Sequence, residues 1–282
     1  MGIQSALWRY MTTRPMQKIR RQDVALLDDE TKDRRFVTAL ARGLDVLRCF
    51  EQGDISLGNL EIAQRTGLPK PTISRLTYTL TQLGYLIYSD KHGTYQLGPG
   101  VLSLGYTMLS SLDIRERAKP FLQELSDKVD ATVALGARDR MEMVYLEVCR
   151  GPGDVTLRID VGDRIPLAST AMGRALLAAL PDSERDFLME HVRKRTEDTA
   201  EFSRIAKGVE QAVVDVVERG FCMSVGDWRK DVNAVGVPLV AHDRNVYGLI
   251  CGGPSFKLPR KMLETECGPQ LIEVAKKITA TI

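Results

Sequence analysis

The chain has 282 residues, 44% of them hydrophobic, and a formal net charge of +2 at pH 7. This length suggests about two domains, and a charge so close to zero restricts any affinity for DNA to a local basic patch. No stretch is long and apolar enough to cross a bilayer, and no signal-peptide pattern opens the sequence, so we expect a cytoplasmic protein without a membrane partner. The five cysteines are scattered and lack any C-x-x-C pair, so neither a disulfide framework nor a metal site is expected.

An N-terminal extension precedes the first predicted domain. Residues 1–22 contain five basic side chains and no acidic one, and an acidic cluster follows between Asp23 and Asp33. We interpret residues 1–35 as a flexible arm whose basic part could touch the DNA backbone. A leader without a function, or a mis-assigned start codon, is equally compatible with this composition.

Residues 36–96 contain the order of elements that is typical of a winged helix-turn-helix domain. A supporting helix is predicted from Phe36 to a stop at Gly53, and two short helices follow. Gly67 can end the first of these, because glycine after a helix tolerates a positive φ, and Pro71 can begin the second without losing a hydrogen bond. The residues expected on the core sides of the three helices are Val37, Leu40, Leu44, Leu47, Leu60, Ala63, Ile73, Leu76, Leu80 and Leu83.

The outward face of the second short helix is the candidate surface for reading a major groove. It carries Thr72, Ser74, Arg75 and Tyr78. Arg75 is expected to contact guanine, because its forked guanidinium matches two acceptors on that base edge. Lys70, Thr72 and Ser74 are expected to bind phosphates, together with the exposed N–H groups of the helix start.

A basic hairpin is predicted after the second short helix. Strands at Tyr85–Tyr88 and Thr94–Leu97 flank a turn in which Lys91 and His92 would reach phosphate or the adjacent minor groove. The segment 65–95 contains four basic residues and one acidic residue, a local net charge of +3. The alternative is a protein-interaction module, although a merely solvated helix would normally mix both signs of charge.

Residues 97–112 are predicted to form a linker helix that has too few charges to face water on all sides. Its apolar members are Leu97, Val101, Leu102, Leu104, Met108, Leu109 and Leu112. We expect the DNA-binding domain of a partner subunit to cover this helix. The alternative is that it packs only within its own chain.

Residues 113–282 alternate between predicted helices and strands, which indicates a mixed α/β sandwich. Helices are expected at Ile114–Val129, Gly173–Leu180, Ser183–Arg193, Ser203–Glu218 and from Pro269. Strands are expected at Thr132–Ala137, Glu142–Val148, Thr156–Asp160, Val235–Val240 and Val246–Gly252, with a loop at Gly162–Pro166. The core stripe of the longest helix is expected to be Val209, Val213, Val216 and Val217.

The segment Leu167–Met172 leads into the helix that is predicted to begin near Gly173. A helix start offers unpaired N–H groups and a partial positive charge, so it can bind a carboxylate without a dedicated cation. Capping of the helix by Ser169 or Thr170 is an alternative that is compatible with such binding.

Four segments together resemble the IclR family of bacterial transcriptional regulators: VTALARGLDVLRCF, GLPKPTISRL, YQLGPGVLSLG and LASTAMGRALLAAL. The resemblance runs from about Phe36 to the C-terminus. It implies an α+β architecture with an N-terminal winged helix-turn-helix, a linker helix through which the family typically dimerises, and a GAF/PAS-like α/β effector-binding domain. The implied function is regulation of transcription by a homodimer or tetramer on a pseudo-palindromic operator in double-stranded DNA, modulated by a small organic acid.

By the same resemblance, the effector would meet the helix start at Ala171, Met172 and Gly173, where the first two amides would bind its carboxylate. Positions at which many family members carry polar groups hold Ser224, Ala234, Ile250 and Gly252 in this chain. We therefore expect a less polar pocket that prefers an aromatic or branched acid.

A tryptophan–arginine pair, Trp228 and Arg229, lies in a predicted loop and could receive a carboxylated ring. The alternative is that Trp228 serves only as a packing lid.

Motifs of the common enzyme classes are not found, and we expect neither an enzyme nor a cofactor. The three histidines, His92, His191 and His242, fall in separate segments and are interpreted as surface residues. The alternative function is small-molecule chemistry in a GAF-like domain, with the winged helix as a protein-interaction module. A gel shift that fails at low salt would favour it.

Overall fold

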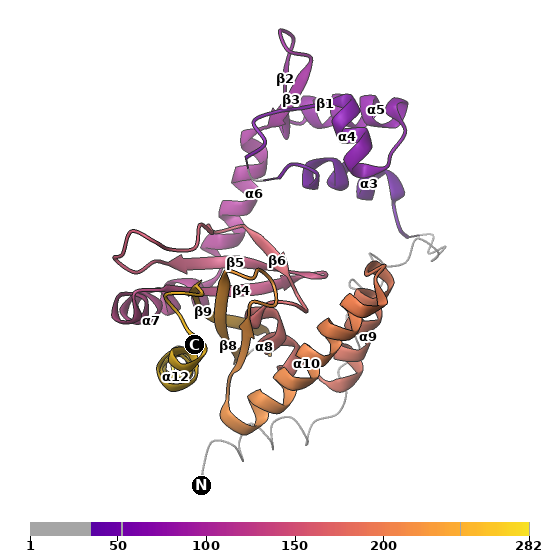
Figure 1. Ribbon diagram of the computed structural model, residues 1–282. Coiled ribbons are helices and arrows are strands. Elements are labelled where there is room, and N and C mark those ends of the chain that lie inside the picture. The colour runs from indigo at the N-terminus through magenta and orange to yellow at the C-terminus, as the bar shows by residue number, and fades with distance from the viewer. Residues whose placement is uncertain (1–34, 52, 243, 282) are drawn as a thin grey trace. The chain divides into compact units, whose positions relative to one another are not determined.

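The computed structural model describes residues 35–281, except residues 52 and 243 (Figure 1). The described residues divide into two compact units between Leu112 and Asp113, each with its own apolar core. The arm predicted at residues 1–35 lies outside the described residues up to position 34. None of the helices in the described ranges is both long enough and apolar enough to span a membrane.

The N-terminal unit is a helical domain with a small antiparallel sheet. Its elements are α3 (Thr38–Arg48), β1 (Leu57–Gly58), α4 (Asn59–Thr66), α5 (Lys70–Gln82), β2 (Leu86–Ser89), β3 (Thr94–Leu97) and α6 (Pro99–Ser110). The strand order is β1-β3-β2, and Gly67 ends α4 with a φ of 68°. The core consists of Val46, Leu57, Ile62, Ile73, Leu80 and Leu86. This is a helix-turn-helix followed by a two-stranded wing.

Part of the predicted core of this unit is wrong. Val37, Leu40 and Leu44 of α3 are exposed, and the buried residues of this helix are Gly43 and Val46. A Cβ at Gly43 would lie 3.9 Å from Leu76 Cδ2, so α3 packs through the side on which it lacks a side chain. Leu47 of the predicted stripe does pack against the core, so the stripe meets the core only near the end of the helix.

Two further core assignments are wrong for local reasons. Leu60 is exposed, whereas Ile62 is buried, because α4 turns the latter toward the core. Leu83 is exposed although its backbone is still helical and its amide donates to the Thr79 carbonyl at 3.0 Å, so the apolar stripe of α5 leaves the core after Leu80. Thr77 is buried in α5, where its hydroxyl donates a hydrogen bond to the Ile73 carbonyl at 2.9 Å.

No residue of α6 is buried in the described chain. Its exposed apolar side chains are Leu102, Leu104, Tyr106 and Met108.

The C-terminal unit is a six-stranded sheet with helices on both faces. Its elements are α7 (Asp113–Val129), β4 (Thr132–Asp139), β5 (Glu142–Cys149), β6 (Arg164–Pro166), α8 (Ala171–Ala179), α9 (Asp182–Arg195), α10 (Thr199–Arg219), β7 (Cys222–Val225), β8 (Val232–Val240), β9 (Val246–Pro254), α11 (Arg260–Met262), the π-helix η1 (Leu263–Cys267) and α12 (Gly268–Thr279). The strand order is β6-β5-β4-β9-β8-β7, and every neighbouring pair is antiparallel. α7 and α12 pack against each other and on the sheet, and α8 packs on β8 and β9 beside α10 (Figure 1).

The predicted strand at Thr156–Asp160 is wrong, because residues 155–160 have no regular secondary structure. Polar groups of this segment are held by Arg150, whose guanidinium donates to the Ile159 carbonyl and lies 2.6 Å from Asp160. The next strand, β6, occupies the segment that we expected to be a loop.

Other elements of this unit also differ from expectation. β7 was not predicted, and β8 begins at Val232 rather than Val235. On α10, Val217 is exposed and Ala212 is buried in its place. His191 is buried rather than on the surface, with its Nδ1 2.8 Å from the Phe187 carbonyl.

Candidate functional site

The outward face of α5 presents the side chains that were predicted to contact DNA. Lys70, Ser74, Arg75 and Tyr78 are exposed, and Tyr78 keeps 66% of its surface accessible. Thr72 is half-buried. The helix therefore offers an arginine and an aromatic ring within one turn of each other.

The start of α5 has fewer free hydrogen-bond donors than the sequence suggested. Pro71 has no N–H group, and the Thr72 amide donates to the Pro69 carbonyl at 2.9 Å. The Ser74 hydroxyl donates to the Lys70 carbonyl at 3.2 Å, although its lone pairs stay open. A phosphate near this end would thus be held mainly by the Lys70 ammonium.

Arg65 does not contribute freely to the local positive charge. Its guanidinium forms an ion pair with Asp54 and also donates to the Cys49 carbonyl at 3.0 Å. The hydrogen bond from Arg65 holds the pKa of the Asp54 carboxyl below its ordinary value. Within the described segment 65–95, the other basic side chains are Lys70 and Arg75 of α5 and Lys91 of the wing, and all three are exposed.

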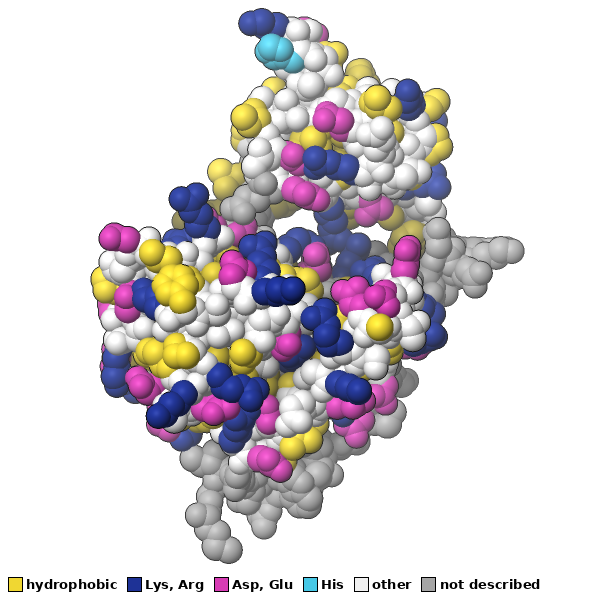
Figure 2. All heavy atoms as spheres, in the orientation of Figure 1, with side chains coloured by type: hydrophobic (Ala, Val, Ile, Leu, Met, Phe, Trp, Pro, Cys, Tyr) yellow, Lys and Arg dark blue, Asp and Glu magenta, His cyan; other side chains and the backbone are white. Residues whose placement is uncertain are grey.

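The wing is a tight hairpin with a charged tip. The amides of His92 and Gly93 both donate to the Ser89 carbonyl, at 3.2 and 2.8 Å, and Gly93 adopts a φ of 65°. Lys91 and His92 are exposed, and basic and histidine side chains cover the tip of the β2–β3 hairpin in Figure 2. Behind the tip, the rings of Tyr88 and Tyr95 lie 4.9 Å apart and stiffen the hairpin.

In the C-terminal unit, glycines let the start of α8 approach the sheet closely. A Cβ at Gly236 would lie 2.2 Å from the Ala171 carbonyl oxygen, and one at Gly248 would lie 2.6 Å from Met172 Cγ. A Cβ at Gly136 would lie 2.4 Å from Met172 Sδ. Ala171 and Met172 are consequently buried and fixed against β4, β8 and β9.

The first two amides of α8 have no hydrogen-bond partner among the described residues. Thr170 caps α8, because its Oγ1 accepts a hydrogen bond from the Gly173 amide at 3.3 Å. The first amides of a helix have no partner within it, so those of Ala171 and Met172 point out of the helix end. Capping and an anion site are thus compatible at this position.

The register of the sheet places four residues in one row beside the helix start. Ser224 pairs with Ala234, Ala234 with Gly252, and Gly252 with Thr132. Directly paired residues of antiparallel strands project from the same face, so this row forms part of one floor. The sequence predicted Ser224, Ala234 and Gly252 as effector contacts, but not Thr132.

A second row lies two residues along the same face. It contains Gly236, which contacts Ala171, and Ile250, which pairs with both Gly236 and Ala134. Ala134, Ala234 and Ile250 belong to the same apolar cluster as Met172. The floor is thus predominantly apolar where it meets α8.

The loop between β7 and β8 contributes the tryptophan. Trp228 is half-buried and packs against the apolar cluster, which agrees with the lid interpretation. Arg229 is exposed, and its guanidinium lies 4.4 Å from the centre of the Trp228 ring.

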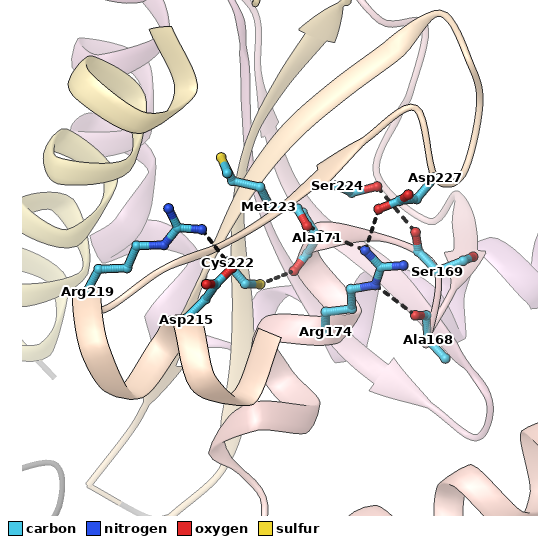
Figure 3. A network of polar contacts seen from close by, with 10 residues as sticks. All are labelled: Ala168, Ser169, Ala171, Arg174, Asp215, Arg219, Cys222, Met223, Ser224 and Asp227. Atoms are coloured by element: carbon cyan, nitrogen blue, oxygen red, sulfur yellow. Dashed lines mark hydrogen bonds and ion pairs between the residues drawn. The ribbon is translucent and has the colours of Figure 1, made fainter. Parts of the chain in front are cut away.

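An ion pair that the sequence did not reveal holds this loop to α8. Arg174 Nη1 lies 2.5 Å from Asp227 Oδ2, and its Nε donates to the Ala168 carbonyl at 3.1 Å (Figure 3). The Arg174 side chain is only 4% exposed. Figure 3 also shows Ser224, whose hydroxyl donates to the Ser169 carbonyl at 3.4 Å. No grouping of acidic, histidine and cysteine side chains that could hold a metal ion is found in the described ranges.

A winged helix-turn-helix joined to an α/β unit of this kind defines the class of DNA-binding transcriptional regulators with an effector domain. Residues 39–89 match the IclR helix-turn-helix domain, and residues 106–280 match the domain described as "Bacterial transcriptional regulator IclR C-terminal". The chain belongs to the IclR family of bacterial transcriptional regulators.

Individual relatives agree with this assignment. The HTH-type transcriptional regulator TsaQ1/TsaQ2 of Comamonas testosteroni is 35% identical over 86% of this chain and 88% of its own length. A crystal structure of an IclR family transcriptional regulator from Brucella abortus is 49% identical, with a TM-score of 0.82 over 95% of this chain and all of the other. An IclR homologue from Microbacterium hydrocarbonoxydans, crystallised with 4-hydroxybenzoate, has the same fold at 21% identity, with a TM-score of 0.67 over 86% of this chain and 98% of its own.

Proposed function

We propose that this regulator binds a pseudo-palindromic operator as a homo-oligomer in the cytoplasm, and that a small organic acid modulates the binding. Residues 36–96 would bind DNA, residues 97–112 would link and dimerise, and residues 113–282 would bind the effector. The proposal rests on two features that this chain combines. The face of α5 is exposed and carries basic and aromatic side chains. The first amides of α8, which have no partner among the described residues, lie beside an apolar floor.

On the DNA side, Arg75 is the residue proposed to read a base, because it projects from the first turns of α5 without an acidic partner nearby on that helix. Tyr78 lies next to it and would contact sugar or a base edge. Lys70, Thr72 and Ser74 would bind phosphates, as would Lys91 and His92 of the wing.

Assembly would follow from α6. No residue of α6 is buried among the described residues, and Leu102 is 74% exposed. A partner subunit that covers this helix would remove its apolar surface from water. A two-fold dimer would then present two copies of α5 to two half-sites.

On the effector side, the amides of Ala171 and Met172 beside Gly173 would bind the carboxylate. The rest of the site would be Ser224, Ala234, Ile250, Gly252, Trp228 and Arg229. The methyl group of Ala234, the sec-butyl group of Ile250 and the ring of Trp228 make this set largely apolar, and the Ser224 hydroxyl already donates to the Ser169 carbonyl. We therefore propose an aromatic or branched carboxylic acid rather than glyoxylate or pyruvate.

A thermal-shift screen of organic acids tests the effector proposal. A ligand that binds only the folded state raises the melting temperature, by RT ln(1 + [L]/Kd) in free energy. Aromatic or branched acids should raise the melting temperature. A shift by glyoxylate alone would contradict the proposal that the apolar floor prefers larger acids. A gel shift with duplexes selected from a random pool tests DNA binding, and its failure at low salt would favour the protein-interaction role for the winged helix.

The helix-start site is tested by Ala171→Pro, which removes one amide. Proline is tolerated at the first helical position, and Thr170, with a ψ of 151°, already has the extended backbone that precedes proline. Ala171→Pro should abolish the ligand-induced shift, whereas Thr199→Pro at the first position of α10 should leave it intact.

A further inference from the structure

Thr132 is a buried residue with an unused hydroxyl. It is 1% exposed at the first position of β4, and its Oγ1 has no hydrogen-bond partner among the described residues. A buried hydroxyl without a partner destabilises the folded state, because water no longer satisfies it. Valine has nearly the same shape without this cost, so packing alone does not account for a threonine here.

The register of the sheet gives the direction of this side chain. Thr132 pairs with Gly252, which pairs with Ala234, so all three project from the face on which α8 packs. The alternation along β4 agrees, because Ala134, two residues further on, belongs to the apolar cluster that contains Met172.

The neighbours of Thr132 in this row are small. Gly252 has no side chain, and a Cβ there would lie 3.1 Å from the Ala234 Cβ. Leu157 and Trp228, which come from connecting segments, pack against the apolar cluster on this face and are only partly buried. The hydroxyl is therefore flanked by small residues, on a face whose cluster includes side chains that are not fully buried.

We propose that Thr132 is a specificity-determining residue that binds a second polar group of the effector, at the end opposite its carboxylate. This inference rests on the proposed function, since it uses the same floor and the same helix start. The threonine hydroxyl both donates and accepts, so a neutral hydroxyl on the ligand is its natural partner.

The sheet geometry sets the length of such a ligand. Gly236, which contacts Ala171, and Thr132 lie two strands apart and two residues apart along the strand direction. Their separation on the sheet is therefore roughly 12 Å. A hydrogen bond of about 3 Å at each end leaves about 6 Å between the two polar ends of the ligand. That span corresponds to one six-membered ring between a carboxylate and a hydroxyl, so the effector class is a hydroxylated ring carboxylic acid.

The experiment measures discrimination between paired ligands by the full-length protein. Hydroxybenzoates and hydroxyphenylacetates are each titrated beside the parent acid that lacks the hydroxyl. The native protein should prefer the hydroxylated member of at least one pair by roughly tenfold, the size expected for one buried hydrogen bond. In Thr132→Val that preference should fall to about one while the affinity for the parent acid is kept.

Three further measurements make the result specific. Thr132→Ser retains the hydroxyl and should retain the preference for the hydroxylated acid. Thr196→Val removes a hydroxyl that donates to the Val192 carbonyl outside the floor, and it should leave that preference unchanged. Without ligand, Thr132→Val should melt at a higher temperature than the native protein, because the unpartnered hydroxyl is gone. A lower melting temperature would show that Thr132 has a structural partner and would overturn the inference.

Failure of the inference is distinguishable from failure of the proposed function. If ring acids bind and Thr132→Val discriminates as the native protein does, Thr132 has no role in specificity, although the effector site stands. If no carboxylic acid shifts the melting temperature, the proposed function itself fails. Binding of parent acids only, with hydroxylated ones rejected, would also overturn the role of Thr132.

Discussion

Asp227→Asn should destabilise the C-terminal unit by removing the charge that balances a buried arginine. The Arg174 side chain is 4% exposed, and its Nη1 lies 2.5 Å from Asp227 Oδ2. Asparagine keeps the shape and one acceptor oxygen, so the substitution tests the charge rather than the packing. A Cβ at Gly208 of α10 would lie 2.3 Å from Arg174 Nη2, so the guanidinium has little room to reorient toward water.

The expected loss follows from two opposing considerations. Breaking a buried ion pair by removing one partner typically costs about 3–5 kcal/mol. The cost here is smaller, because Asp227 is 37% exposed and Arg174 keeps the carbonyls of Ala168 and Met223, at 3.1 and 3.4 Å. We expect Asp227→Asn to lower the free energy of unfolding by about 2 kcal/mol.

Urea unfolding of the full-length protein, followed by circular dichroism, measures this loss. The matched control is Glu190→Gln, which removes the charge from an exposed pair with Arg193 on α9 and should leave the free energy of unfolding nearly unchanged, because solvent screens this pair. Equal losses in the two variants would refute the reasoning, because they would show that burial adds nothing to the Arg174–Asp227 pair.

Three other predictions concern DNA reading, assembly and thiol chemistry. Arg75→Ala should cost about 1–3 kcal/mol on the selected duplex and relax preference at one base position, whereas Lys91→Ala should weaken binding to all sequences alike in gel shifts. Leu102→Glu should place a charge in the proposed subunit contact of α6 and shift the mass measured by light scattering toward that of a monomer. Burial raises the pKa of the Cys222 thiol to about 12, so iodoacetamide at pH 8 should modify this cysteine only after unfolding, since the thiolate is the reactive form.

Each of these predictions has an outcome that contradicts it. A loss for Arg75→Ala that is the same on selected and random duplexes would assign Arg75 to the phosphate backbone. An unchanged mass for Leu102→Glu, with Ser103→Glu as the exposed control on the same helix, would remove α6 from the interface. Rapid alkylation of Cys222 in the native protein would show that β7 opens readily.

The winged helix could be predicted from the sequence because its signals are local. Gly67 ends α4 in the left-handed conformation and Pro71 stands in the first turn of α5, and both need only their neighbours in the chain. The core side of α3 could not be predicted in the same way. Its packing depends on the missing side chain of Gly43 opposite Leu76, which hydrophobic periodicity does not record.

The effector floor was only partly predictable, because it depends on strand register. Ala234, Ile250 and Gly252 were found through the family resemblance, but Thr132 enters the same row only through its pairing with Gly252. Arg174 was overlooked because an arginine within an apolar helix gives no hint of its partner, and Asp227 lies beyond two intervening helices in the sequence. His191 was misplaced for a similar reason, since its burial comes from the packing of α9.

The glycines beneath α8 divide the proposed effector site into a rigid side and an adjustable side. Because Ala171 and Met172 occupy the space left by Gly136, Gly236 and Gly248, lifting the helix from the sheet to admit a larger acid would break these close contacts. Any adjustment falls to residues 150–163 and to the Trp228 loop, which lack continuous ladder hydrogen bonds. Reshaping those segments around a ligand would consume part of the binding free energy, so an effector should bind more weakly than its contacts suggest while leaving the sheet unchanged.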